Sequence, residues 1–526
     1  MSWIVVDDDG GYIKLVSKAD EDGLLPRGSF LTIDGDDVQF ILRVDKSKQG
    51  FPYSPSPMIV DMDLTGLGAD RKCQNIVHAA RVKDVTSRTD GKIDFVRPQA
   101  IARRSRQEEV DLAIGSHDTG PRVFIATVHG GQNQLLVDDD GDFITARLPE
   151  DMFFHQMMVC GKTGSGKTVA LKYLAQYFTD VVEGAVLAVN VKDVDLLRMN
   201  QPSNSQSPDV QREWGVLGLE AKGIDNFVVY YPAGRDLTDY QNPILGLDTD
   251  RFQAITLSVD EIEPEALSGL LQGISDTAAQ SLPDIFRFWR EEERAPGAKF
   301  LDFVDYFAEV GETGQRSFPA KNERGDILSV PLHYATYKNL QRVLSKGVVF
   351  FDNEDALVAD EQRILEPGKL TVIDVGKEGL QFGAIVLRHL LRRIVRSKSL
   401  QTSAVPVLVM IDEVHNFYRS DASQDALGEL DTICRQGRSQ KIGVVFSSQN
   451  PSDIPRGLDS VINTKIMLRS DPGSVRLQGL SVTSDELESL DRGFAVVNVH
   501  DAPRLKIVKF PLSPAGVIEG GVQDEQ

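Results

Sequence analysis

One eight-residue stretch, GKTGSGKT at residues 161–168, restricts the possible folds of this chain more than any other feature. It fits the pattern G-x-x-x-x-G-K-[ST], in which glycines let successive backbone N–H groups turn toward a phosphate and a following helix adds positive potential. The apolar run MMVC before it resembles a short buried strand, and residues 169–178 have the apolar spacing of a helix. This order of strand, loop and helix favours a phosphate-binding loop in an α/β fold over a structural turn rich in glycine and lysine.

The residues of this loop have separate expected roles in binding ATP and Mg²⁺. Lys167 is expected to reach the β- and γ-phosphates, and the hydroxyl of Thr168 is expected to hold Mg²⁺. Three glycines permit backbone angles that a Cβ atom would forbid. The predicted nucleotide-binding residues are Gly161, Lys162, Thr163, Gly164, Ser165, Gly166, Lys167, Thr168 and Val169.

The composition describes an ordinary globular protein. Of its 526 residues, 41% are apolar and 26% are charged, and the length suits two or three domains. No run of about 18 apolar residues occurs and the N-terminus MSWIVVDDDGG is acidic, so we expect no membrane span, no signal peptide and a cytoplasmic location. The net charge of −21 argues against a protein that coats nucleic acid with its outer surface, but not against DNA in an internal channel. Three widely separated cysteines predict neither a disulfide framework nor a metal site.

The first 120 residues have the pattern of a small antiparallel barrel or sandwich. Short β segments alternate there with Asp-Gly and Pro turns. The predicted strands are FLTI (30–33), VQFILRV (38–44), MIVDMDL (58–64) and KIDFV (92–96), with VFIATV (123–128) and LLVDDDGDFI (135–144) leading toward the phosphate loop.

After the loop, near-continuous apolar runs predict a parallel sheet that is buried on both faces. The first two runs are separated by a long stretch with apolar residues at helical spacing, which predicts a helical insertion. The runs are AVLAVNV (185–191), LTVIDV (370–375), PVLVMI (406–411), IGVVFSS (442–448), TKIMLR (464–469) and FAVVNV (494–499). We expect a β-rich domain over 1–120, two parts of an α/β core over 121–245 and 365–500, a helical insertion over 246–364 and a tail over 501–526.

A predicted helix over residues 383–398 carries an arginine stripe. With Leu387, Leu391 and similar residues turned inward, Arg388, Arg392 and Arg396 share the opposite face at i, i+4 and i+8. A solvated or subunit-facing stripe is favoured over a DNA contact.

The strand VLVMI ends in two carboxylates that complete a nucleotide site. Asp412 is expected to hold Mg²⁺ through water, and Glu413 to polarise the water that attacks the γ-phosphate. RQGR at 435–438 follows about 25 residues later, and its arginines could stabilise transition-state charge if a neighbouring subunit presents them. The strand over 442–448 is followed by Gln449, which can sense the γ-phosphate. An ordinary basic loop is the alternative interpretation of RQGR.

The order of these motifs identifies a resemblance. DEVH and RQGR are similar to the DExH helicases of superfamily 2, but those enzymes carry the arginine motif on a second lobe, whereas here it follows the carboxylates within one sheet. GKTGSGKT, then VLVMIDEVHNF, then ICRQGRSQKIGVVFSSQNPSDIPRGLDSVINTKIMLR closely resembles the HerA branch of the HerA/FtsK ATPases. The segment LEPGKLTVIDVGKEG (365–379) and the long insertion also resemble that family.

The resemblance implies a RecA-like P-loop ATPase core, a small N-terminal β-barrel like that of ATP synthase subunits, and a ring hexamer with ATP sites between subunits. It further implies double-stranded DNA in the central pore and a partner, which is the nuclease NurA in archaea and a sirtuin-like or nuclease effector in bacterial anti-phage defence. On the positions that match, Lys167, Thr168, Asp412, Glu413 and Gln449 take the site roles. Arg438 is the arginine-finger candidate, which Arg435 could replace or assist, and the tail from about residue 501 resembles a segment that braces a neighbouring subunit.

Two classes of function remain open at this point. The leading hypothesis is a hexameric, ATP-driven DNA translocase. The rival is a ring scaffold that uses ATP mainly to assemble an effector, and the low content of basic residues keeps this rival open. A conjugation or secretion coupling ATPase would usually bring a membrane segment.

Overall fold

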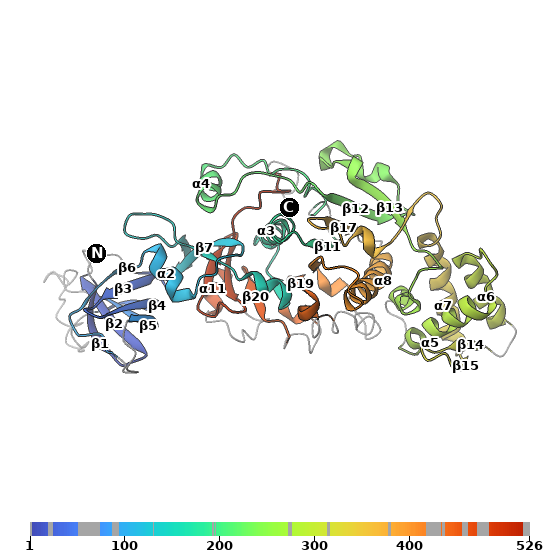
Figure 1. The fold of residues 1–526 in the computed structure, drawn as a ribbon, viewed down its shortest axis with the longest axis horizontal. Helices are drawn as coiled ribbons and strands as arrows, with labels where there is room; N and C mark the ends of the chain where they lie inside the picture. Colours follow the sequence, from blue (N-terminus) through green and yellow to red (C-terminus); the bar gives the residue numbers. More distant parts are fainter. Residues whose placement is uncertain are drawn as a thin grey trace, which may run out of the picture.

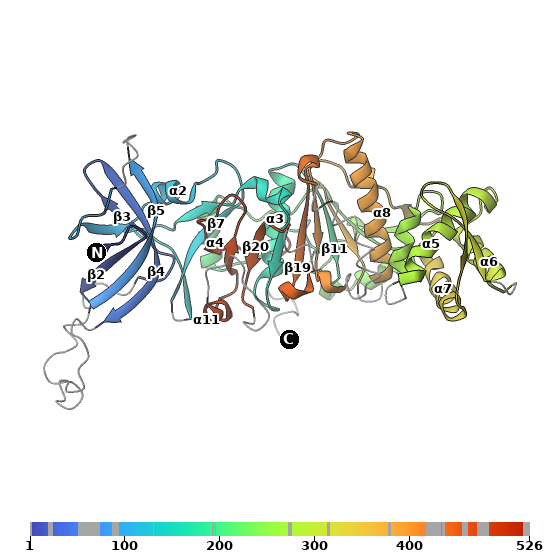
Figure 2. The ribbon, with the colours of Figure 1, turned by 90° about the horizontal axis from the view of Figure 1, so that it is seen from below.

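The computed structural model describes residues 3–18, 25–50, 74–86, 94–129, 131–191, 194, 196–271, 276–312, 316–376, 380–416, 433, 437–454, 461–470 and 483–518. Three bodies lie in a row along its long axis (Figure 1): an N-terminal barrel, a central sheet with helices, and a mostly helical body. Figure 2 shows the barrel and the helical body at opposite ends of the central sheet.

The N-terminal body is a closed barrel with the strand order β1-β2-β5-β4-β3-β6. Antiparallel pairing of β1 with β6 closes it, and Trp3, Leu15 and Leu42 are among the buried residues that fill its interior. Closure leaves no free sheet edge, which explains how a small β domain is stable beside a larger one. The strands are β1 (Trp3–Asp8), β2 (Tyr12–Lys18), β3 (Phe30–Asp34), β4 (Val38–Gly50), β5 (Gln74–Thr86) and β6 (Ile101–Arg104).

The barrel confirms the predicted architecture but corrects one strand. Residues 94–96 of the expected strand KIDFV form no strand, whereas residues 92–93 and the expected strand over 58–64 lie outside the described residues. Side chains bind this backbone in place of a strand partner, since the Val96 N–H donates to Asp8 and Arg81 donates to the Asp94 carbonyl. Val96 is nevertheless buried. The apolar residues of KIDFV therefore indicated burial correctly, but not pairing in a strand.

The central sheet contains all six apolar runs predicted as strands, together with the strand of MMVC. They are β10 (Met157–Cys160), β11 (Ala185–Asn190), β17 (Leu370–Asp374), β18 (Val407–Ile411), β19 (Ile442–Ser448), β20 (Thr464–Met467) and β21 (Phe494–Asn498). The order β17-β11-β18-β19-β10-β20 is parallel, and β21, β22 (Ile507–Lys509) and β7 (Arg122–His129) add antiparallel strands beyond β20. The placement of β19 between the phosphate-loop strand β10 and the carboxylate strand β18 is the RecA-like arrangement.

Helices cover both faces of this sheet, as the near-continuous apolar strands predicted. Along β11, Val186 and Ala188 pack with α3 (Lys167–Asp180), whereas Leu187 and Val189 pack on the other side with α8 (Leu380–Ser399). Of the helices formed by the described residues, none combines the length and the apolarity that a membrane crossing requires.

The body at the far end of the sheet has an aromatic core built from helices. The helices α5 (Asp276–Phe288), α6 (Phe300–Glu312) and α7 (Tyr334–Gly347) bury Phe286, Phe303, Phe307 and Tyr337 against one another. The hairpin of β14 (Ser317–Lys321) and β15 (Ile327–Pro331) packs with them.

The main sheet is wider than the sequence predicted. The strands β12 (Phe227–Pro232), β13 (Phe252–Thr256) and β16 (Leu357–Val358) extend it beyond β17. The last two lie within residues 246–364, where only a helical insertion was expected. The sequence of β13, FQAIT, lacks an uninterrupted apolar run, and β16 has only two residues, so their pairing with distant residues is what places them in the sheet.

The described part of the C-terminal tail lies on its own chain. β22 pairs with β21 and β7, and the Lys172 amino group of α3 donates to the Gly516 carbonyl at 2.7 Å. The Trp214 indole likewise donates to the Leu512 carbonyl at 2.8 Å. Bracing of a neighbouring subunit by this tail therefore stays a prediction, and residues 501–518 serve first as part of this chain's own fold.

Candidate functional site

The phosphate loop connects β10 to α3 in the predicted order. Its backbone is held by neighbouring strands, since Gly161 N–H donates to the Ser448 carbonyl at 3.2 Å and Lys162 N–H to the Arg469 carbonyl at 2.8 Å. Gly166 precedes the first helical residue with a φ of 98°, which a side chain rarely adopts. A Cβ at Gly161 would lie 2.5 Å from the Ser165 hydroxyl. Glycine is thus required at both positions for the loop to close.

The two carboxylates lie where the sequence placed them, at the carboxyl end of β18. Asp412 and Glu413 are almost completely buried. The Ser447 hydroxyl donates to Asp412 Oδ1 at 2.7 Å, and the Glu413 N–H donates to the same oxygen at 3.0 Å. Glu413 has a φ of 46°, a left-handed conformation that is uncommon for residues other than glycine and is found where a structure holds a functional residue under strain.

The loop lysine and the Glu413 carboxylate meet directly. Lys167 Nζ lies 3.1 Å from Glu413 Oε1, and both side chains are at most 8% exposed. Because both charges are removed from water, the loss of either partner would leave a buried charge without compensation. The side chain expected to bind phosphate, Lys167, thus lies in direct contact with the side chain expected to activate water, Glu413.

Gln449 and His415 surround the same carboxylate. Gln449 Nε2 lies 3.4 Å from Glu413 Oε1, a long hydrogen bond, and His415 Nδ1 lies 3.3 Å from Glu413 Oε2. His415 was not predicted as a site residue, although its position two residues after Glu413 in the motif DEVH was a usable signal. Cys160 ends β10 close to this site. Burial raises the pKa of its thiol to about 12, so the thiol stays protonated and is not a nucleophile.

Arg438 lies away from this site within the same chain. It is exposed in the short turn Gly437–Gln440 that precedes β19, whereas the phosphate loop follows the opposite end of the sheet, where Ser448 pairs with Cys160. The seven residues of β19 span ~20 Å at about 3.3 Å per residue, which is far longer than an arginine side chain. Arg435 lies outside the described residues. Arg438 cannot therefore reach its own chain's phosphate loop while this sheet is intact.

The residues present fit ATP and Mg²⁺. The Ser165 hydroxyl is buried in the loop and finds no hydrogen-bond partner among the described residues, and none of their atoms lies within 4 Å of the position that a Gly164 Cβ would take. The Thr168 hydroxyl and the Asp412 carboxylate are the oxygen ligands that Mg²⁺ takes when phosphates and water complete its shell. Among the described residues, no group of three or more His, Cys, Asp or Glu side chains is placed to hold a metal ion.

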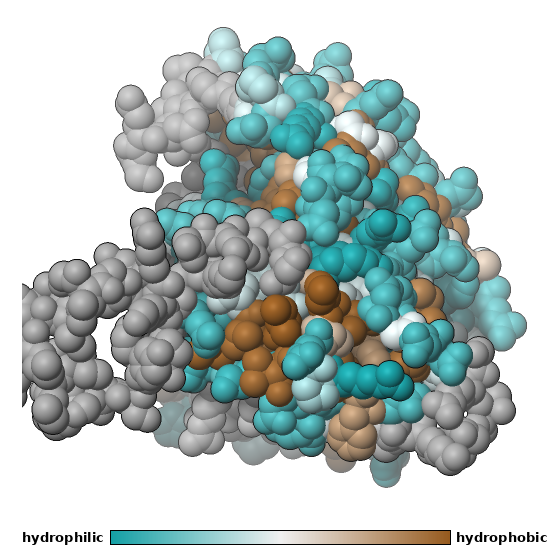
Figure 3. Space-filling view, turned by 90° about the vertical axis from the view of Figure 1, so that its left-hand side faces the viewer, coloured by the Kyte–Doolittle hydropathy of each residue, from teal (hydrophilic) through white to brown (hydrophobic). Residues whose placement is uncertain are grey.

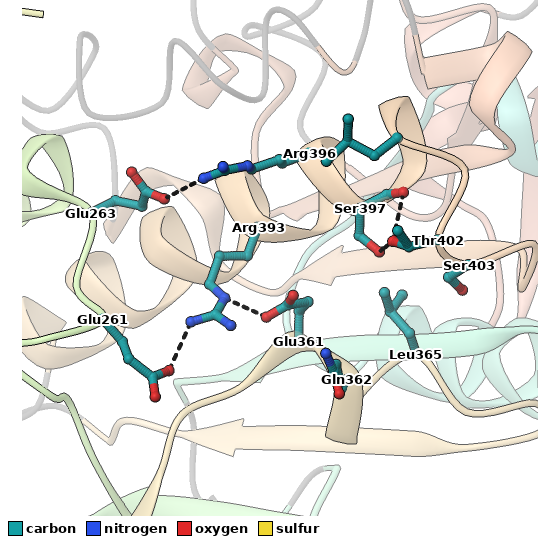
Figure 4. A pocket seen from close by; sticks show the side chains of 11 residues that line it. Glu261, Glu263, Glu361, Gln362, Leu365, Arg393, Arg396, Ser397, Thr402 and Ser403 are labelled. Atoms are coloured by element: carbon teal, nitrogen blue, oxygen red, sulfur yellow. Dashed lines mark hydrogen bonds and ion pairs between the residues drawn. The ribbon is translucent and has the colours of Figure 1, made fainter.

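A polar cavity of about 700 Å³ lies elsewhere, between α8 and the start and end of the helical body (Figure 4). Its charged groups pair with one another: Arg393 binds Glu261 at 2.8 Å and also Glu361, and Arg396 approaches Glu263 at 4.0 Å. Arg392 of the predicted stripe also lies 3.4 Å from Glu265. Arg392 thus helps to attach the helical body to the sheet, whereas the Arg396 side chain is 74% exposed, so a solvated or subunit-facing role for the stripe stays a prediction.

Comparison with known proteins supports the resemblance that the motifs carry, although no family model matches the chain. The DNA double-strand break repair helicase HerA of Pyrococcus furiosus is 22% identical over 280 residues, or 46% of this chain and 50% of the relative. HerA of Sulfurisphaera tokodaii is 29% identical over 246 residues, or 41% and 49%. HerA of Saccharolobus solfataricus is 22% identical over 396 residues, or 70% and 66%. The chain thus spans between about half and two thirds of the length of these curated relatives.

Solved structures with a related arrangement include the bacterial conjugative coupling protein TrwBdeltaN70, with a TM-score of 0.44 and 15% identity over 71% of this chain and 89% of that one. VirB4 of Thermoanaerobacter pseudethanolicus has a TM-score of 0.41 and 13% identity over 76% and 98%. The strand order and the site geometry of this chain are themselves those of a RecA-like core. The phosphate loop, the paired carboxylates on the strand two places away and the matches to HerA together make this chain a HerA-like P-loop protein.

Proposed function

We propose that this chain is an ATPase that drives translocation along double-stranded DNA as a ring of six subunits. The observation that carries the proposal is the buried contact of Lys167 with Glu413, with Gln449 beside it. It unites a phosphate-binding cation, a carboxylate base and an amide at the carboxyl edge of one sheet, which is the set that phosphoryl transfer to water requires.

The side chains have distinct tasks in hydrolysis. Lys167 leaves Glu413 for the phosphates when nucleotide binds, and Glu413 is then free to orient and polarise a water molecule. Thr168 and Asp412 would hold Mg²⁺, which would supply positive charge next to the phosphates. Gln449 bonds to the same carboxylate, so it is placed to align water against the phosphate.

In a ring, a neighbouring subunit supplies the arginine that stabilises charge on the γ-phosphate. Because Arg438 cannot reach the phosphate loop of its own chain, its proposed role requires a neighbouring subunit whose nucleotide faces that edge. DNA then occupies the ring's centre, which is compatible with the net charge of −21 because only the pore needs to be basic.

A protein partner is part of the proposal. Figure 3 shows apolar side chains gathered on the barrel end of the molecule. Ile101 is 62% exposed there and pairs across the strands with Ile4, which is 42% exposed. Large contiguous apolar patches on a protein surface often mark contacts with another protein. We propose a nuclease or defence effector as the partner, with NurA-like and sirtuin-like proteins as the candidates.

The experiment measures ATP hydrolysis by the purified chain with and without duplex DNA, next to Lys167→Ala and Glu413→Gln. We expect DNA to raise the turnover rate, Lys167→Ala to lose ATP binding, and Glu413→Gln to keep binding but lose turnover. A turnover rate that is the same with and without DNA would favour the second candidate, a ring scaffold for an effector. The apolar surface of the barrel is also compatible with that candidate. A Glu413→Gln protein that hydrolyses ATP at the parental rate would overturn the catalytic assignment.

A further inference from the structure

A loop far away in the sequence packs directly on the phosphate loop. β21 runs antiparallel to β20, so the residues just before β21 lie at the same sheet edge as the phosphate loop. The Gly493 N–H donates to the Ser165 carbonyl at 2.9 Å. A Cβ at Gly166 would lie 2.9 Å from Gly493 N and 3.6 Å from Arg492 Cγ. Arg492 therefore adjoins the last turn of the loop, where α3 begins.

The surroundings of Arg492 contain no described partner for its charge. It is exposed, and within the ranges that the structure describes, no hydrogen bond or ion pair of its guanidinium is present. Asp491, the adjacent acid, accepts instead from Asn133 Nδ2 at 3.3 Å. Lys509, which lies near Gly493, is paired with Glu213. Arg492 thus combines an available guanidinium with a position beside a phosphate cradle.

We propose that Arg492 binds the phosphate chain of the nucleotide held by its own subunit, an inference that rests on the proposed ATP site. Guanidinium groups bind phosphate oxygens through paired, charge-assisted hydrogen bonds, for which lysine is a poor substitute. The Gly493–Ser165 hydrogen bond fixes the position of the arginine backbone relative to the loop. Arg492 is therefore a ground-state ligand in cis, whereas Arg438 acts only in trans and during turnover.

This assignment predicts a particular pattern of affinities. Because ADP retains the β-phosphate that the loop surrounds, Arg492→Ala should weaken ATP and ADP alike, by about 10- to 100-fold, the range for a hydrogen bond to a charged group. Arg492→Lys should recover only part of the loss. Arg342→Ala is the matched control, because Arg342 is also an exposed arginine but lies on α7 in the helical body, and its loss should leave both affinities unchanged.

The test titrates ATP and ADP into the full-length wild-type protein and these variants by calorimetry, with thermal unfolding of each as a check on folding. Wild-type affinity for ADP in a folded Arg492→Ala protein overturns the inference. If the wild type itself binds no ATP, or binds it as Lys167→Ala does, the proposed function fails instead.

A mixing experiment separates cis from trans. Subunits with Arg492→Ala and subunits with Glu413→Gln each carry a defect in their own site, so a mixture should recover no activity beyond that of the Arg492→Ala protein alone. Recovery on mixing would mean that Arg492 serves a neighbouring subunit, which would overturn the cis assignment.

Discussion

Arg438 offers the sharpest test of an intersubunit site. The perturbation is a pair of variants, Arg438→Ala and Glu413→Gln, each expected to be inactive alone. If Arg438 acts in trans, mixed rings contain interfaces where an intact Glu413 faces an intact Arg438 from the next subunit. Those interfaces should hydrolyse ATP.

The size of the expected effect follows from the position of Arg438. It precedes a seven-residue strand whose far end meets the phosphate loop, so the separation of ~20 Å excludes a contribution to its own site. Loss of an arginine finger slows turnover by about 10³ to 10⁵, whereas random mixing in equal amounts restores roughly a quarter of the interfaces. Rescue should therefore exceed either parent by at least about 100-fold.

The assay is ATP turnover after the subunits have been dissociated, mixed and reassembled, with single-turnover measurements at a low fraction of variant subunits to reveal any coordination around the ring. Unmixed variants and Arg342→Ala serve as controls. If Arg438→Ala turns over normally while Arg435→Ala is inactive, the role belongs to Arg435. Normal turnover by both variants would reduce RQGR to a basic loop and remove the intersubunit site.

Three further outcomes are expected from other parts of the molecule. Burial lowers the pKa of His389 to about 4, so unfolding takes up a proton below pH 6.5 and stability should fall by about 3 kcal/mol as the pH drops from 6.5 to 4. Chemical denaturation of His389→Leu should not show this loss of stability at low pH. If the free energy of unfolding of His389→Leu depends on pH as that of the wild type does, the role of His389 is contradicted. Gly443→Ala should lower the free energy of unfolding by about 3 kcal/mol, because its Cβ would lie 1.8 Å from the Phe153 carbonyl oxygen. Gly215→Ala is the control: its Cβ would lie in open space on α4 (Pro208–Leu217), so it should raise that free energy by up to about 1 kcal/mol, and equal melting temperatures of the two variants would disprove this. DNA binding should weaken steeply with salt, and a flat response in a salt titration would count against a phosphate-lined channel.

The part of the site that follows from local sequence was predictable. The phosphate loop needs only glycines and a lysine within eight residues, and the two carboxylates come directly after a buried strand. Both features are local in the sequence, so their residues could be identified without knowledge of any tertiary contact. Many strands of the central sheet were equally visible, because burial on both faces leaves an uninterrupted apolar run, but β12 was missed although its sequence FVVYYP is such a run. Burial also misled in one place, since Val96 is buried without pairing in a strand.

The tertiary structure alone decided which distant residues meet. Arg492 and Gly493 carry no motif, and only the antiparallel return of β21 brings them to the phosphate loop. The short strands β13 and β16 joined the sheet for the same reason, because their hydrogen-bond partners lie far away in the chain. Periodicity records that a side chain is buried but not which neighbour buries it, and the pairing of remote strands is settled only when the whole sheet assembles.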